Sequence, residues 1–156
     1  MKKNSQEIFD EIKADWDSKF LSSKNLLASV CRSQDLGSLD LITKDISSKL
    51  DLKENDIFLE VGCGTGVLLS KLSEIPKESY GLDYSNEAIK TARIEFPNIK
   101  FFVSDAAKLP FEDEKFTKLL CYSVFHYFAD IFITSFEGVF DHFPPTLKTF
   151  LNNISK

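Results

Sequence analysis

The feature that most constrains the fold is a glycine-rich turn between an apolar run and a helical pattern. In the stretch FLEVGCGTGVLLSKL, residues 58–72, Gly62, Gly64 and Gly66 fall within five positions. A strand, a glycine turn and a helix in this order place backbone N–H groups and the positive end of the helix dipole at the carboxyl end of the strand. Ligands of doubly wound α/β folds bind there. The turn therefore predicts a binding site as well as a fold class.

Short apolar runs alternate with helical patterns after this point, which indicates β-α-β units and a mainly parallel sheet. Two amphipathic helical patterns precede the sheet. Pro76 and Pro97 follow two of the predicted helices, and Ser85 is placed to cap the second of them. We expect strands at 57–61, 79–82, 99–103 and 116–122, and helices at 5–20, 39–50, 66–74 and 86–95. This pattern is a Rossmann-like, doubly wound α/β fold.

Composition and charge narrow the function classes. The 156 residues, 43% of them hydrophobic, suit a single globular domain. The net charge is −5 and no basic stripe is present, so we expect no nucleic-acid partner. The N-terminal stretch has no apolar run, so we expect no membrane partner and a cytoplasmic location. The three cysteines show no C-x-x-C spacing, which favours free thiols and no metal site.

The glycine turn could hold a triphosphate, a dinucleotide or a ligand without phosphates. A phosphate-binding P-loop needs a lysine that is absent between Glu54 and Ser70. The dinucleotide fingerprint needs a third glycine where this chain has Val67. Both phosphate interpretations are therefore disfavoured.

Acidic residues follow three successive predicted strands: Glu60, Asp83 and Asp105. Parallel strands bring these ends to one rim of the sheet. Three like charges around a crevice disfavour a polyphosphate and favour a ligand with hydroxyls, amines and positive charge.

Four motifs in order resemble the class I S-adenosylmethionine-dependent methyltransferases. LEVGCGTG is similar to the first motif of that family, GLDYS to its acidic second-strand motif, VSDAAKLPF to its third, and LLCYSVFHYF to its fourth-strand motif. The resemblance covers residues 55–128. It implies S-adenosyl-L-methionine as cofactor and methyl transfer to a small-molecule acceptor.

The resemblance also implies roles for individual residues, and these are carried over position by position. The backbone of Gly62, Cys63 and Gly64 approaches the methionine part of the cofactor, and Glu60 lies near its amino group. Gly66 is also expected among the cofactor-binding residues. Asp83 accepts hydrogen bonds from the ribose hydroxyls, Tyr84 packs on the adenine, Asp105 and the backbone of Ala106 read the adenine edge, and Tyr122 lines the pocket close to the sulfonium. No catalytic residue is assigned, although His126 and Tyr127 follow the fourth strand and could accept a proton.

We expect one domain, 1–156, made of a helical segment (1–54), a cofactor-binding core (55–128) and an atypical tail (129–156). The tail does not resemble the family, whose sheet has seven strands, so we expect an incomplete sheet. Two interpretations stay open: a short working enzyme, or a truncated or non-catalytic cofactor-binding domain. A nicotinamide-dependent oxidoreductase is a remote third, and the acceptor and the oligomeric state are open.

Overall fold

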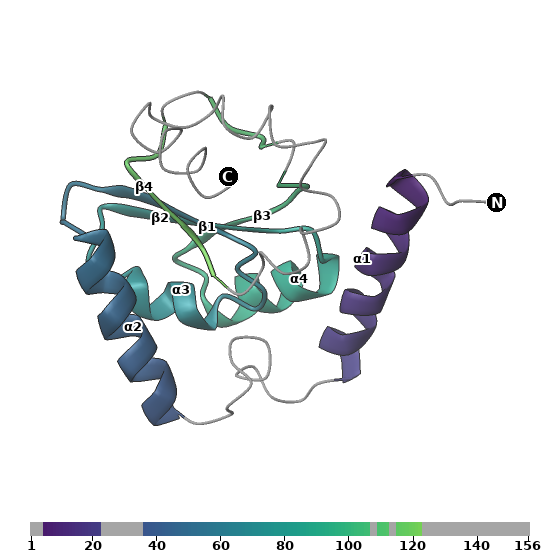
Figure 1. The fold of residues 1–156 in the computed structure, drawn as a ribbon, viewed down its shortest axis with the longest axis horizontal. Coiled ribbons are helices and arrows are strands. Elements are labelled where there is room, and N and C mark those ends of the chain that lie inside the picture. Colours follow the sequence, from purple (N-terminus) through teal and green to yellow (C-terminus); the bar gives the residue numbers. More distant parts are fainter. Residues whose placement is uncertain (1–4, 23–35, 107–108, 113–114, 123–156) are drawn as a thin grey trace, which may run out of the picture.

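The structure is a computed structural model that describes residues 5–22, 36–106, 109–112 and 115–122. These residues form a parallel sheet with helices packed on it (Figure 1). The helices are α1 (Ser5–Ser22), α2 (Leu36–Leu50), α3 (Val67–Leu72) and α4 (Asn86–Glu95), and the strands are β1 (Ile57–Val61), β2 (Glu78–Asp83), β3 (Lys100–Val103) and β4 (Lys118–Cys121).

The strand order is β3-β2-β1-β4, and each neighbouring pair is parallel. The chain first builds outward from β1 through β2 to β3 and then crosses back to place β4 on the other side of β1. Such a reversal of strand order creates a crevice at the carboxyl ends of the strands. The predicted fold class, a Rossmann-like parallel sheet with N-terminal helices, is confirmed. The described residues contribute four strands to this sheet.

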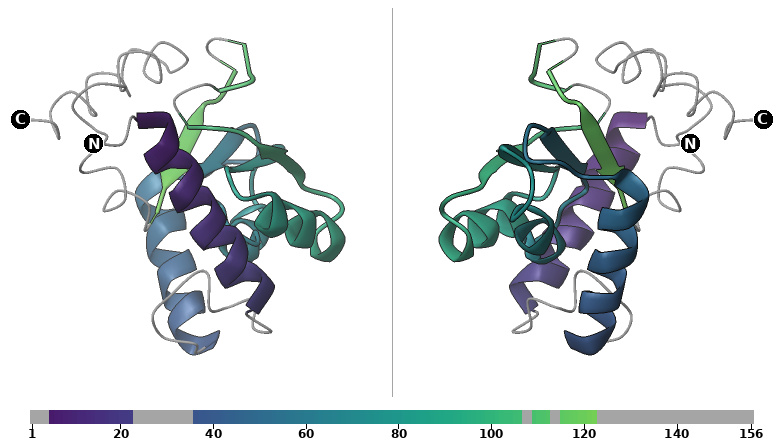
Figure 2. Two further views of the ribbon diagram at one scale, coloured as in Figure 1. Left: turned by 90° about the vertical axis from the view of Figure 1, so that its right-hand side faces the viewer. Right: turned by 90° about the vertical axis from the view of Figure 1, so that its left-hand side faces the viewer.

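One face of the sheet is covered by α2, α3 and α4 (Figure 1). Phe58 of β1 and Phe101 of β3 are buried there against Leu69 and Leu72 of α3 and Ile89 of α4. Helix α1 packs against α4 (Figures 1 and 2). No helix in the described part of the chain is both long and apolar enough to span a bilayer.

The opposite face carries the alternate strand residues and an aromatic cluster. Tyr80 of β2 meets Phe116 edge-on with ring centres 5.2 Å apart, and Phe111 meets Phe116 at 4.9 Å. The Lys115 ammonium lies 4.4 Å from the centre of the Tyr80 ring. Aromatic pairs of this geometry, with a cation over one ring, stabilise the segment that leads into β4.

The observed elements differ from the predicted ones mainly at their ends. Helix α3 is shorter at both ends than the predicted 66–74. It begins after Gly66, whose φ of 79° is left-handed, and near its end the Ser70 and Ser73 hydroxyls donate to carbonyls of their own turn. The predicted cap of α4 is confirmed, since the Ser85 hydroxyl accepts from the Ala88 N–H at 3.1 Å.

Candidate functional site

A tight loop follows β1 at the point where the strand order reverses. Its three glycines, Gly62, Gly64 and Gly66, have φ values of 75°, 54° and 79°, a region that side-chain-bearing residues rarely adopt. The N–H groups of Gly62 and Cys63 donate to the Leu82 carbonyl oxygen at 2.7 and 3.0 Å. The loop is therefore fastened to the end of β2, at the carboxyl ends of the strands.

Asp83 links this loop to the start of α4. Its Oδ2 accepts from the Gly64 N–H at 2.9 Å, and its Oδ1 accepts from the Ser85 N–H at 2.9 Å. Burial raises the pKa of the Asp83 carboxyl, and the backbone N–H donors oppose that rise. Each carboxylate oxygen has a second lone pair, so Asp83 can hold the loop and still accept from ligand hydroxyls.

Glu60 is an acid buried inside the end of β1, with 3% of its surface exposed. Its Oε2 has no hydrogen-bond partner among the described residues. Burial first, and the nearby Asp83 charge second, raise the pKa of Glu60 to about 8. Buried polar atoms in proteins are almost always paired. An acid with a free oxygen and a strongly raised pKa in a crevice marks a candidate ligand site.

The other predicted site residues lie around the same rim. The Ser104 N–H donates to the Asp83 carbonyl oxygen at 3.0 Å, which joins the end of β3 to the end of β2. Tyr84, Asp105 and Ala106 are half-buried beside this junction. Tyr122 follows β4 and packs on the helix side of the core. The topology thus brings these positions to the carboxyl ends of the strands, while their contact with a cofactor stays a prediction.

The three predicted acids do not form one equivalent cluster. Glu60 and Asp83 are both buried, and the Asp83 charge contributes to the raised pKa of Glu60. Asp105 is only half-buried and lies two residues beyond β3. The buried pair is therefore the electrostatic centre of the rim.

Two glycines of the site serve packing. A Cβ at Gly66 would lie 2.7 Å from the Phe101 ring, so this glycine lets α3 approach β3 closely. A Cβ at Gly81 would lie 2.6 Å from Phe101 and 2.8 Å from the Cys63 sulfur. Gly81 is not among the predicted site residues, although a glycine inside a strand is a known sign of close approach.

The buried Cys63 side chain is part of the same packing. Burial raises the pKa of its thiol well above the usual value, so the sulfur is held as an unreactive thiol. Burial likewise raises the pKa of Cys121 to about 12. Both are free cysteines, as predicted, and Cys31 lies outside the described residues.

Comparison with known families decides the identity of the fold. Residues 58–156 match a family model described as a methyltransferase domain. The chain belongs to this family. It is a class I S-adenosylmethionine-dependent methyltransferase by family, as its four motifs predict. The match runs to residue 156, so the expectation that residues 129–156 do not resemble the family is wrong.

Methyltransferase relatives share the middle of the chain. It is 34% identical over 90 residues to an uncharacterised methyltransferase-like protein of Schizosaccharomyces pombe, covering 57% of this chain and 35% of that protein. It is 35% identical over 74 residues to a demethylmenaquinone methyltransferase of Chlorobaculum tepidum, covering 47% and 31%. It is 29% identical over 121 residues to a probable ribosomal RNA small subunit methyltransferase A of Methanococcus vannielii, covering 70% and 44%. The chain thus spans less than half the length of these relatives.

A solved structure with the same fold is the putative methyltransferase in complex with the Haloferax volcanii Trm112 methyltransferase activator. The TM-score is 0.64 at 22% identity, with 84% of this chain and 56% of the other chain covered. At this identity the likeness shows the fold alone. The relatives act on different acceptors by name, so they do not support the expected exclusion of nucleic acid.

Asp17 on α1 contacts the start of α4 and is not among the predicted site residues. Its Oδ1 accepts hydrogen bonds from the Ser85 hydroxyl and from the Glu87 N–H, the latter at 3.3 Å. Its charge also contributes to the raised pKa of Asp83. The sequence places Asp17 on the polar side of an amphipathic helix, and nothing in that pattern distinguishes it from the other acids there.

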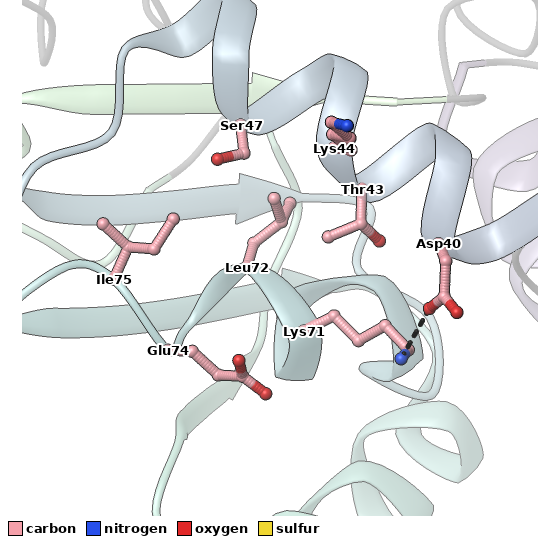
Figure 3. Close-up of a pocket in the computed structure, with 8 residues that line it drawn as sticks. All are labelled: Asp40, Thr43, Lys44, Ser47, Lys71, Leu72, Glu74 and Ile75. Atoms are coloured by element: carbon pink, nitrogen blue, oxygen red, sulfur yellow. Dashed lines mark ion pairs between the residues drawn. The ribbon is translucent and has the colours of Figure 1, made fainter.

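A shallow pocket of about 290 Å³ lies elsewhere, between α2 and the end of α3 (Figure 3). An ion pair at 2.8 Å between Lys71 and Asp40 lies across it. It includes none of the predicted cofactor residues. Its lining residues are Asp40, Thr43, Lys44, Ser47, Lys71, Leu72, Glu74 and Ile75.

Proposed function

We propose that the chain binds S-adenosyl-L-methionine at the rim formed by Glu60, the glycine loop and Asp83, and that it transfers the methyl group to a small-molecule acceptor. The observation that carries the proposal is the buried Glu60 carboxyl, whose Oε2 is unpaired among the described residues. An ammonium group at this place satisfies that oxygen and offsets the desolvation of the acid. A pyrophosphate would add negative charge beside two buried acids.

The surrounding residues suit the rest of this cofactor. The glycines at 62 and 64 carry no Cβ, which would let a ligand approach the peptide groups of this loop. Asp83 has lone pairs left for two ribose hydroxyls. Tyr84, Asp105 and Ala106 would bind the adenine, and Tyr122 would lie near the sulfonium.

When bound, the cofactor supplies an electrophilic methyl group on a sulfonium. The contribution of the chain is alignment and exclusion of water, both of which lower the barrier of an in-line transfer. A dedicated base is not required for an acceptor that is already nucleophilic. His126 and Tyr127, the candidates for accepting a proton, lie outside the described residues.

A small-molecule acceptor is supported by charge. The chain has a net charge of −5, and RNA binding depends on neutralising phosphates with clustered lysines and arginines. The name of one relative points to a small quinone acceptor and that of another to ribosomal RNA. We therefore rank small molecules first and RNA second. A cytoplasmic location remains a prediction.

The cofactor site is tested by calorimetric titration at pH 8. Wild-type protein should bind S-adenosylhomocysteine and should give no heat with NADH. Glu60→Gln should bind the same ligand at least about tenfold more weakly, because a charge-assisted hydrogen bond is worth about 1.5–3 kcal/mol. The matched control is Ser79→Ala, which removes another buried oxygen without a partner among the described residues, near the start of β2. Folded wild type that binds no S-adenosylhomocysteine would overturn the proposal.

The acceptor is tested with cofactor that carries a labelled methyl group. Incubation with a panel of small nucleophiles and, separately, with total RNA should place the label on a small molecule. Label on RNA would replace the small-molecule acceptor with a nucleic-acid one. S-adenosylhomocysteine binding without any transfer would instead favour a non-catalytic binding domain.

A further inference from the structure

We propose that Asp17 is a positioning residue that couples the seating of α1 to the cofactor site. The inference rests on the proposed function, because it concerns how the same rim is held in place. The inference goes beyond the proposed function because it assigns a role to helix α1, which contributes none of the predicted cofactor-binding residues.

Asp17 caps a helix to which it does not belong. Its carboxylate accepts from the Ser85 hydroxyl and from the Glu87 N–H, which are 68 and 70 residues away in the sequence. The Ser85 hydroxyl in turn accepts from the Ala88 N–H at 3.1 Å. The first N–H groups of a helix lack partners within the helix, and a negative charge there is favourable. The start of α4 is thus held by its own cap and by α1 together.

The same contact continues to the glycine loop. The Ser85 N–H donates to Asp83 Oδ1 at 2.9 Å, and the Gly64 N–H donates to Asp83 Oδ2 at 2.9 Å. Ser85 is fully buried, so it has little room to move independently of Asp17. A hydrogen-bonded chain therefore runs from Asp17 through Ser85 and Asp83 to Gly64. The orientation of the Asp83 carboxylate depends on where α1 sits.

The same contact attaches α1 to the start of α4. Asp17 is half-buried, and its hydrogen bonds with Ser85 and Glu87 join two helices that pack against each other. Ligand binding that orders Asp83 and Ser85 should therefore also tighten α1, and loss of the α1 contact should weaken ligand binding. Coupling between two sites is reciprocal in this way.

The test compares three substitutions on α1 by calorimetry with S-adenosylhomocysteine. Asp17→Ala removes the carboxylate that accepts both hydrogen bonds. It should raise the dissociation constant about fivefold to tenfold, which corresponds to the typical effect of removing a helix cap. Asp17→Asn keeps an acceptor oxygen, so it should bind S-adenosylhomocysteine within about threefold of wild type. The rescue should be incomplete because a neutral hydrogen bond is weaker than one to a carboxylate. The matched control is Asp15→Ala on the same helix, which removes only an exposed ion pair with Lys19 and should bind like wild type.

Hydrogen exchange on the peptide covering residues 5–22 gives the second readout. Addition of S-adenosylhomocysteine should slow exchange of this peptide in wild type and in Asp15→Ala, and should leave it unchanged in Asp17→Ala. If Asp17→Ala does not fold, Ser85→Ala breaks the same chain from the other end and should abolish the same protection.

The outcomes separate the two proposals. Absence of S-adenosylhomocysteine binding by folded wild type refutes the proposed function itself. If wild type binds and Asp17→Ala binds equally well with α1 still protected, the cofactor site stands and the role of Asp17 is wrong. If Asp17→Asn binds S-adenosylhomocysteine as weakly as Asp17→Ala does, the hydrogen bonds of Asp17 do not explain its role, which would also contradict the proposal.

Discussion

Replacing Glu60 with Gln should make the free protein more stable at pH 8 and at the same time a weaker binder. The pKa of the Glu60 carboxyl rises from 4.5 to about 8 because the side chain is buried beside Asp83. An unfolded chain ionises this acid near its ordinary pKa, whereas the folded chain holds the proton up to about pH 8. The unfolded state therefore binds fewer protons in this window, and stability falls as pH rises through it.

The size of the effect follows from the shift. A rise from 4.5 to about 8 corresponds at pH 8 to about 4 kcal/mol of lost stability, at about 1.4 kcal/mol for each pKa unit. Local relaxation and water entry reduce such penalties. We take about 2 kcal/mol as the expected gain for Glu60→Gln at pH 8. At pH 5 the gain should be well under about 1 kcal/mol, because Glu60 is protonated in the folded state and the pH lies only about half a unit above the pKa of 4.5 in the unfolded chain. In a chain of this size the gain at pH 8 raises the melting temperature by roughly 4–8 °C.

The assay is urea unfolding of wild type and Glu60→Gln at pH 5, 6, 7 and 8, with Ser79→Ala as a pH-independent control. The stability difference between wild type and Glu60→Gln should grow steadily with pH. A difference that is the same at pH 5 and pH 8 would refute the reasoning, because it would mean that Glu60 ionises normally in the folded protein. The opposite signs on stability and on binding would mark Glu60 as a residue kept for its ligand.

The same structure predicts the outcome of two other perturbations. Gly81→Ala places a Cβ 2.6 Å from the Phe101 ring, so it should lower the free energy of unfolding by about 1–3 kcal/mol in urea titrations, and Phe101→Leu should recover part of the loss in the double variant. Unchanged stability of Gly81→Ala would show that β2 and β3 can move apart. Cys63 should resist iodoacetamide at pH 8 in the folded protein and react in urea, because burial keeps its thiol protonated and covered. Alkylation of folded Cys63, seen by peptide mass spectrometry, would contradict that burial.

Sequence patterns predict the bounds of an element best where residues that start and stop it lie at both of its ends. β1 has the predicted bounds because its apolar run lies between Asp56 and the glycine turn. α4 has the predicted bounds because Ser85 caps its start and Pro97 follows its end. β4 begins two residues later than predicted, because Phe116 leaves the strand pattern to pack in the aromatic cluster. Such packing is a tertiary effect that periodicity does not report.

The site likewise has features that the sequence predicts and features that depend on tertiary packing. The rule that the carboxyl ends of parallel strands meet at one rim predicts Glu60 and Asp83. This rule needs only the order of strands and turns. The burial that raises their pKa values, and the free oxygen of Glu60, depend on side-chain packing and are visible only in the structure. Asp17 escapes prediction because its partner, Ser85, is 68 residues away on another helix.

The acids that meet at this rim are the strongest indication of the charge of the ligand. Asp17, Glu60 and Asp83 come from three different elements, and the charge of Asp17 adds to the rise in the pKa of Asp83 as the charge of Asp83 adds to that of Glu60. Like charges gathered in a poorly solvated place destabilise the free protein. A ligand that binds there must repay that cost with positive charge and hydrogen-bond donors. An ammonium and a sulfonium with ribose hydroxyls meet this requirement, and the pyrophosphate of a nicotinamide dinucleotide does not. The charge of the site thus supports the proposed S-adenosyl-L-methionine over a nicotinamide dinucleotide.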